Sequence, residues 1–442
     1  MKLDKLIISC FILLTMAVVS CEKVLEVDPV AYIEEGSISS KTDAERLLVG
    51  CYDGLQQTGI YGRHMVIIPG LIADNLGWEG TTLEYGQVDN NSILSDNALV
   101  ESIWNAHYET LNRINYLISK LPDISDMSDG ERADYYGQLY FLRALCHFNL
   151  VRFFGPVPIK TEPTTDLSSN LNPARDDVDA VYQQITSDLL AAADNIQNTD
   201  PGFATNGAVD ALLAKAYLEL GQYTDAVTHA TNVISNYGYS LEPVYADLFT
   251  QQISSEAIFV ILFDELDGNR LAEYFFPTSL NGRYEVAPGD DLINAYGADD
   301  TTRFNASIAG EEPYCTKYPN LSTMANNVYA IRLAEIYLVR AEAEARNSGS
   351  VSAIQYDINQ VRHRAGLGDT DAESYDDLLL AILHERRVEF AFEGKRWFDL
   401  LRYDLAEVLI ESISSPDQLL LPIPLSELQA NTNPGMYQNQ GY

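Results

Sequence analysis

Residues 384–403, HERRVEFAFEGKRWFDLLRY, combine closely spaced charges with an apolar stripe. On a helix, Glu389 lies three residues after Arg386, so the two opposite charges fall on neighbouring turns. Similar neighbours further along are Glu393, Arg396 and Asp399. The apolar side consists of Val388, Phe392, Trp397 and Leu401. The pattern predicts an amphipathic helix pair broken near Gly394. Its charged residues are expected to stabilise the fold, and none of its side chains is arranged as a nucleophile.

Residues 207–238, GAVDALLAKAYLELGQYTDAVTHATNVISNYG, show a helix–turn–helix pattern with Gly221 at the turn. The small residues that would let the two helices approach closely are Ala214, Ala226 and Ala230. This pattern predicts a tetratricopeptide repeat, although it departs from the consensus at Asp210 and Gly238.

Three further helix pairs are expected from apolar periodicity. They span residues 43–57 with 98–120, 131–153 with 177–196, and 329–346 with 352–364. The run AIFVILF at 257–263 predicts a short β-strand that pairs with another short strand. The sequence therefore predicts a mostly α fold of about four degenerate tetratricopeptide pairs in a right-handed scaffold, with short strands in loop-rich insertions. The scaffold would cover about 40–260 and 327–410, and the insertions about 61–95 and 268–326.

The N-terminus has Lys2 and Lys5 before an apolar run at residues 6–19, which is short for a membrane span and typical of a signal peptide. Residues 17–21, AVVSC, resemble a bacterial lipobox. We therefore expect a signal peptide at 1–20 and a single mature domain at 21–442. Cys21 would carry lipid and anchor the protein to a membrane. The alternative is an ordinary secretory signal followed by a chance cysteine.

The formal net charge is −36, from 64 acidic and 28 basic residues. Such a surface repels a phosphate backbone, so a nucleic-acid partner is excluded, whereas neutral sugars meet no such penalty. The six histidines show no paired metal-ligand spacing. Adjacent acids at 290–291 and 299–300 could hold calcium, but such pairs are expected by chance in so acidic a chain. We predict no metal site and no cofactor.

Five motifs, in a constant order, span nearly the whole mature chain. They are FLRALCHFNLVRFFGPVPI at 141–159, RLAEIYLVRAEAEAR at 332–346, INQVRHRAGL at 358–367, the 384–403 segment, and LLPIPLSELQANTNPGMYQNQGY at 420–442. Together they resemble the SusD/RagB family, the surface lipoproteins with which Bacteroidota capture glycans and other nutrients. The resemblance implies a non-catalytic, cell-surface protein of the outer membrane with a SusC-like TonB-dependent transporter as partner. It also implies that irregular loops hold the ligand while the repeats act as scaffold.

A sugar site needs a flat aromatic platform beside polar groups that replace water. Trp104 and Trp397 continue helical apolar stripes and are expected in the core, which leaves Trp78 in a Gly-rich polar loop. Candidate ligand residues near it are Asp74, Asn75, Tyr85 and Asn90. A second wall is expected from Arg283, Tyr284, Tyr296 and Tyr314. The alternative is that Trp78 packs the loop onto the body, that the tyrosines are packing residues, and that Asp74 and Asn75 cap a turn.

Three functions follow as hypotheses. The first is capture of a glycan or oligosaccharide and its delivery to the transporter. The second is peptide uptake, as in RagB-like members, and the third and weakest is a glycoside hydrolase with two catalytic carboxylates. An aromatic platform favours sugar, whereas an exposed β-strand edge favours peptide.

Overall fold

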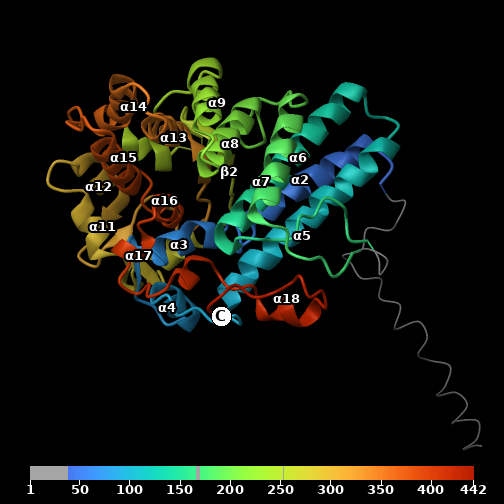
Figure 1. The fold of residues 1–442 in the computed structure, drawn as a ribbon, viewed down its shortest axis with the longest axis horizontal. Helices are drawn as coiled ribbons and strands as arrows, with labels where there is room; N and C mark the ends of the chain where they lie inside the picture. The colour runs from blue at the N-terminus through green and yellow to red at the C-terminus, as the bar shows by residue number, and fades with distance from the viewer. Residues whose placement is uncertain (1–37, 166–169, 252) are drawn as a thin grey trace, which may run out of the picture.

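The computed structural model describes residues 38–165, 170–251 and 253–442. Helices dominate the described chain, and its strands are short (Figure 1). This agrees with the predicted mostly α class. The signal peptide and Cys21 lie outside the described residues. None of the described helices is long and apolar enough to cross a membrane.

The four helix pairs expected from the sequence all form, although residues 329–332, expected at the start of a helix, belong to a β-strand. They are α2 (Lys41–Gln56) with α5 (Ala98–Lys120), α6 (Asp129–Phe154) with α7 (Val178–Ala193), α8 (Asn206–Glu219) with α9 (Tyr223–Asn236), and α13 (Leu333–Arg346) with α14 (Val351–Arg364). Successive pairs also touch, because α5 contacts α6, α7 contacts α8, and α9 contacts α13 (Figure 1). The pairs thus form a continuous array, as expected of a repeat scaffold. That they are tetratricopeptide repeats stays a prediction.

Side-chain caps fix where α2 and α6, the first helices of two of these pairs, begin. Ser40 and Asp43 form a reciprocal capping box at α2, and Ser128 and Glu131 form one at α6. At the other end of α6, Gly155 stops the helix with a φ of 68°, which favours glycine. Local sequence therefore sets the helix boundaries, while the buried faces set the pairing.

Short elements fill the segments between and after the pairs. The remaining α-helices are α3 (His64–Leu71), α4 (Leu83–Asp89), α10 (Leu271–Phe275), α11 (Asp290–Ala295), α12 (Thr301–Ser307), α15 (Tyr375–Glu389), α16 (Arg396–Arg402), α17 (Ala406–Leu409) and α18 (Leu425–Ala430). Single 3-10 turns are η1 (Leu121–Asp123), η2 (Tyr245–Phe249), η3 (Thr278–Leu280) and η4 (Pro416–Leu419).

Three antiparallel strand pairs form in the described residues, and the first two of them cross-link distant segments. They are β1 (Leu76–Trp78) with β3 (Val286–Pro288), β2 (Ala257–Ile261) with β6 (Val328–Arg332), and β4 (Ile308–Ala309) with β5 (Tyr314–Cys315). The strand predicted at 257–263 is therefore confirmed as β2, with a distant partner. The β1–β3 pair joins the two segments expected to be insertions, which sets the position of the candidate site.

The predicted break near Gly394 is confirmed. Helix α15 ends at Glu389 and α16 begins at Arg396. Gly394 has a φ of 71°, and a Cβ there would lie 1.9 Å from the carbonyl oxygen of Met65 on α3. Only glycine fits this close approach.

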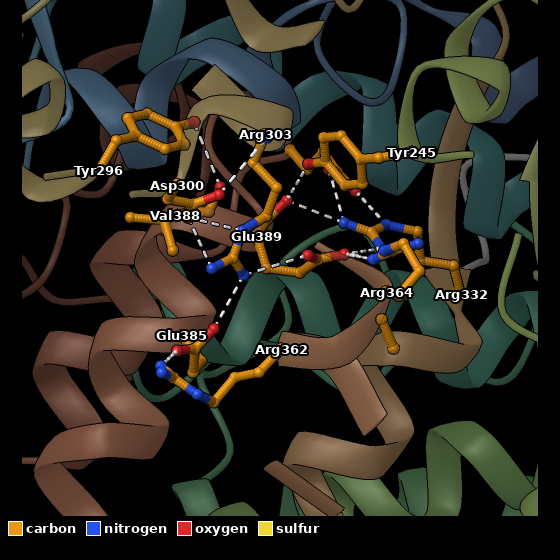
Figure 2. Close-up of polar contacts among 12 residues, drawn as sticks. Tyr245, Tyr296, Asp300, Arg303, Arg332, Arg362, Arg364, Glu385, Val388 and Glu389 are labelled. Carbon is orange, nitrogen blue, oxygen red and sulfur yellow. Dashed lines mark hydrogen bonds and ion pairs between the residues drawn. The ribbon is translucent and has the colours of Figure 1, made fainter. Parts of the chain in front are cut away.

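Glu389, at the end of α15, is buried and receives arginines from three other elements (Figure 2). Arg332 Nη1 donates to its Oε1 at 2.6 Å, Arg303 Nη1 to its Oε2 at 3.4 Å, and Arg364 also pairs with it. The charged members of the network are Glu256, Asp300, Arg303, Lys317, Arg332, Arg362, Arg364, Glu385, Glu389 and Glu393. Five cations meet five carboxylates, so the network is neutral as a whole.

The ion pairs expected on neighbouring turns of 384–403 join Arg386 to Glu389, Glu393 to Arg396 and Arg396 to Asp399, and none of the three forms among the described residues. Asp399 and Arg402, three residues apart, do pair at 2.8 Å. Arg386 Nε instead donates to Asp399 Oδ1 at 2.9 Å, across the α15–α16 break. Arg396 pairs with Asp74, far away in the sequence. The reason is burial, because a buried guanidinium needs several well-placed acceptors and these come from neighbouring elements.

Candidate ligand-binding surface

The two segments expected to be insertions meet at Glu285, which lies next to β3 and is 1% exposed. Its Oε1 accepts from Trp78 Nε1 at 3.2 Å and from the backbone N of Thr82 at 2.7 Å. Its carbonyl oxygen accepts from the backbone N of Glu79 at 3.1 Å and of Gly80 at 3.2 Å. A single buried glutamate therefore fixes the loop that carries Trp78. The sequence analysis missed Glu285, because nothing local marks it among 64 acidic residues.

Trp78 is half-buried at the end of β1, and its ring packs on helix α4. A Cβ on Gly86 would come within 2.7 Å of ring atom Cζ3, so Gly86 lets the indole lie flat against the helix backbone. Asn90 is exposed one turn further on, and its Nδ2 donates to the carbonyl oxygen of Gly86 at 2.8 Å. The indole is thus held on one face and through its N–H, with Asn90 nearby.

Arg283 lies beside this platform with its side chain 38% exposed. Its guanidinium stands 4.8 Å from the ring centroid of Tyr274, and its Nη1 donates to Tyr274 Oη at 3.1 Å. Its Nη2 is 3.5 Å from Glu285 Oε2. Tyr274 is also covered by Arg63, whose Cζ lies 4.0 Å from the ring centroid. These contacts orient the guanidinium while leaving part of it open to solvent.

Tyr284, next to Arg283 in the sequence, and Tyr314 are half-buried. Tyr284 Oη donates to the carbonyl oxygen of Pro313 at 3.0 Å, which joins the segment before β3 to β5. The ring of Tyr314 packs 4.7 Å from that of Phe276. Both rings are therefore positioned by the protein and keep an accessible part.

Asp74 and Asn75 fasten the Trp78 loop to the 384–403 segment. Asp74 accepts from Arg396 Nε at 2.6 Å and Nη2 at 2.7 Å, and Arg387 Nη2 lies 3.0 Å from its Oδ2. Asn75 Oδ1 accepts from Arg387 Nε at 3.0 Å. Burial raises the pKa of Asp74, but the hydrogen bonds and charge of Arg396 and the charge of Arg387 outweigh it and bring the pKa below its ordinary value. The side-chain oxygens of Asp74 and Asn75 therefore bind arginines of the 384–403 segment, and neither residue merely caps a turn.

Tyr85 and Tyr296 were expected to face ligand, but the structure places them inside. Tyr85 is 1% exposed and packs 5.8 Å from the ring of Tyr274. Tyr296 is 3% exposed and its Oη donates to the carbonyl oxygen of Val388 at 3.2 Å, at the edge of the ion network (Figure 2). A buried ring cannot stack on a surface ligand, so the accessible candidates reduce to Trp78, Asn90, Arg283, Tyr284 and Tyr314.

Two features bear on other chemistries. In the described part of the chain, no group of three or more His, Cys, Asp or Glu could hold a metal ion. Some backbone hydrogen-bonding groups on the edge of β2 that faces away from β6 already have partners. Val260 N donates to the carbonyl oxygen of Pro201 at 3.0 Å. Just after the strand, the carbonyl oxygen of Leu262 accepts from Gln56 Nε2 at 2.7 Å. This edge therefore offers a peptide little room to add a strand.

Comparisons with known proteins agree over most of the chain. A family profile described as "SusD family" matches residues 238–416, and one described as "Starch-binding associating with outer membrane" matches residues 31–218. SusD-like protein P2 of Formosa agariphila is 27% identical, over 98% of this chain and 99% of its own length.

Two solved structures extend the likeness to the fold. A laminarin-binding SusD-like protein superposes with a TM-score of 0.82 at 28% identity, covering 91% of this chain and 100% of its own. A SusD superfamily protein from Bacteroides thetaiotaomicron gives a TM-score of 0.80 at 26% identity, covering 90% and 99%. The shared architecture thus covers about nine-tenths of the chain.

Proposed function

Because the chain belongs to the SusD/RagB family, we propose that it is a non-enzymatic, glycan-binding lipoprotein of the cell surface that delivers an oligosaccharide to a SusC-like TonB-dependent transporter. The observation that carries the proposal is the half-buried Trp78, held by Glu285 and Gly86 beside Arg283. The laminarin-binding relative supports a sugar as the ligand class.

The chemistry of the surface fits a sugar ring. A pyranose presents C–H groups on its face and hydroxyls at its edge, so the indole of Trp78 would receive the face. The exposed guanidinium N–H groups of Arg283 and the amide of Asn90 would take the place of water at the hydroxyls. Tyr284 and Tyr314 would form the second wall. Because the indole is already fixed, binding would cost little ordering of that side chain.

The cellular location follows from the N-terminus and the family. We propose that residues 1–20 are removed and that lipid on Cys21 holds the protein at the outer membrane, with the domain facing outward. The profile name that mentions the outer membrane supports this location. Segments 61–95 and 268–326 would then be the ligand-binding parts of the single domain at 21–442.

Peptide uptake is the principal alternative. The partly covered edge of β2 disfavours strand addition there, while the fixed indole favours a sugar. A hydrolase is less favoured, because Glu285 and Asp74 are engaged in hydrogen bonds and ion pairs within the protein.

The test uses the soluble chain without residues 1–21 and a panel of plant, fungal and host glycans, measured by affinity electrophoresis and calorimetry. We expect one glycan class to bind, and Trp78→Ala to weaken it at least about tenfold, since a central aromatic contact is commonly worth 2 kcal/mol or more. Tyr356→Ala, an exposed aromatic on α14 (57% exposed), is the matched control and should bind as wild type does. Equal binding by Trp78→Ala and wild type would refute the site, and binding of peptides alone would refute the ligand class.

A further inference from the structure

A narrow crevice lies where the end of α6 meets α8, α13, α15 and α16. Its cationic lining residues are Arg152, Lys215, Arg386, Lys395 and Arg402. Its carboxylates are Glu219, Glu335 and Asp399. Glu342, behind Arg402, is matched by Arg346. Five cations facing three carboxylates leave a surplus of two positive charges, in contrast to the neutral network around Glu389.

Two of the three carboxylates are each shared between cations, and the third, Glu219, pairs with Arg402 at 3.1 Å. Glu335 takes Lys215 at 2.8 Å and Lys395 at 3.1 Å. Asp399 takes Arg386 at 2.9 Å and Arg402 at 2.8 Å. They therefore leave the positive surplus uncompensated.

Arg152 is the clearest part of that surplus. Its guanidinium lies between two rings, with Cζ 4.0 Å from the centroids of both Phe148 and Phe398. It donates to the carbonyl oxygen of Phe148 at 3.2 Å and to Asn149 Oδ1 at 3.1 Å. Among the described residues it makes no ion pair with a carboxylate. An uncompensated charge held between apolar rings is costly unless a counter-charge approaches.

A second observation concerns Arg386, which also lines the crevice. Arg386 is 4% exposed, and its Nη1 is a buried donor with no hydrogen-bond partner in the described part of the chain. Buried donors in native proteins almost always have a partner, so Nη1 calls for an acceptor that is not a protein atom.

The size of the space selects the ligand. The crevice has a cavity volume of about 10 Å³, and an adjoining cavity that shares Arg152, Lys215 and Lys395 has about 20 Å³. Each holds about one water-sized body. A phosphate, a carboxylate or a sugar is too large, so the space suits a single body of about the size of water.

We propose that this crevice binds a single halide ion, chloride under physiological conditions, between Arg152, Lys215 and the Nη1 of Arg386. The anion compensates part of the positive surplus and gives Nη1 its acceptor. Bound there, it joins α6 and α8 of the helix array to α15 and α16 of the 384–403 segment. The inference does not depend on the proposed glycan site.

The state of Lys215 agrees with this arrangement. Burial first, and then the charges of Lys395 and Arg152, lower its pKa to about 7 against the opposing effect of Glu335. The groups nearest to it are Glu335 of α13, Lys395 before α16, and Arg152 and the Phe148 ring of α6. Other charged groups that line the same two cavities are Glu219 of α8, Arg386 of α15, Glu393 between α15 and α16, and Asp399 and Arg402 of α16. An anion favours the charged lysine, so binding takes up a proton, and affinity for the anion falls as pH rises through about 7.

The test uses the mature chain with Cys21→Ser. Its melting temperature is followed as sodium chloride replaces sodium gluconate at constant ionic strength, at pH 6 and pH 8. We expect a saturable rise with chloride and with bromide that is larger at pH 6. Crystals grown in bromide are expected to show one anomalous peak beside Arg386 Nη1.

Two variants make the result specific. Arg152→Met removes the unpaired cation and should abolish the chloride-dependent rise, whereas Arg46→Met, an arginine with a 78% exposed side chain, should keep it. A rise that never saturates, or that persists in Arg152→Met, would overturn the proposal. So would a crevice occupied by water alone in the bromide crystal.

Discussion

The segment from Tyr274 to Tyr318 splits into two halves with opposite roles. Its first half carries Arg283, which is 38% exposed and stacks on Tyr274 at the candidate ligand surface. Its second half carries Arg303, which is fully buried between Asp300, Glu385 and Glu389. Two arginines in one irregular segment therefore have different roles, one at the candidate ligand surface and one in the buried ion network. What separates them is the number of carboxylates that the rest of the fold brings to each.

The largest expected effect is loss of stability in Arg303→Met. The change leaves Asp300, Glu385 and Glu389 buried with one cation fewer. Breaking a buried ion pair from one side costs about 3–5 kcal/mol, because the partner charge stays behind uncompensated. We expect that decrease in the free energy of unfolding, measured by urea denaturation followed by circular dichroism. An Arg303→Met protein as stable as wild type would show that the two halves of the segment do not differ as argued.

The next effect is acid sensitivity of the buried half. Burial raises the pKa values of Glu389 and Glu393, but the arginines and Lys317 around them outweigh burial and bring both below the ordinary value. A depressed pKa contributes stability that is fully present above the unfolded value, about 4.3 for Glu, and is lost as pH falls through the folded value. The free energy of unfolding should therefore decrease from pH 5 to pH 3.

The same experiment on Arg303→Met sharpens the comparison. Arg303 is one of the charges that lower the pKa of Glu389, so the decrease between pH 5 and pH 3 should be shallower in the variant. Urea titrations at pH 5, 4 and 3 measure both proteins. Parallel pH profiles for variant and wild type would contradict the assignment of Glu389 as a major source of acid sensitivity.

The sequence predicts the helix array because its signals are local. The apolar stripes of the four pairs, the turn at Gly221 and the break at Gly394 depend on residues within one or two turns. Strand β2 was predictable for the same reason, from the apolar run at 257–263. These elements need no knowledge of distant partners.

The site was less predictable because its determinants are long-range. Glu285 holds Trp78 from 207 positions away, and Asp74 meets Arg396 from 322 positions away. For tyrosines in irregular segments no periodicity reports burial, so Tyr85 and Tyr296 looked equivalent to Tyr284 in the sequence. Most of the charge pairs expected within 384–403 failed for a related reason, since Arg386 and Arg396 are buried and find their carboxylates on other elements, whereas only Asp399 and Arg402 pair three residues apart.

The smallest effect on stability, and the one that tests the open half of the segment, is expected for Arg283→Met. Its ion pair with Glu285 is long at 3.5 Å and partly exposed, so its loss should change the free energy of unfolding by less than about 1 kcal/mol. Ligand binding should nevertheless weaken about fivefold to tenfold, because a donor to the sugar hydroxyls is lost.

Arg113→Met is the matched control for Arg283→Met. Arg113 has a similarly exposed side chain (36%) that pairs with Asp53 and Glu109 away from the Trp78 loop. Calorimetry with the glycan that binds best should show unchanged affinity for this control and reduced affinity for Arg283→Met. If both variants bind equally well, Arg283 belongs to the framework as Arg303 does, and the ligand surface contracts to Trp78 and its nearest neighbours. If Arg283→Met also lowers the free energy of unfolding strongly, the division of the segment into an exposed half and a buried half is wrong. Side-chain exposure would then fail to distinguish residues that bind ligand from residues that stabilise the fold.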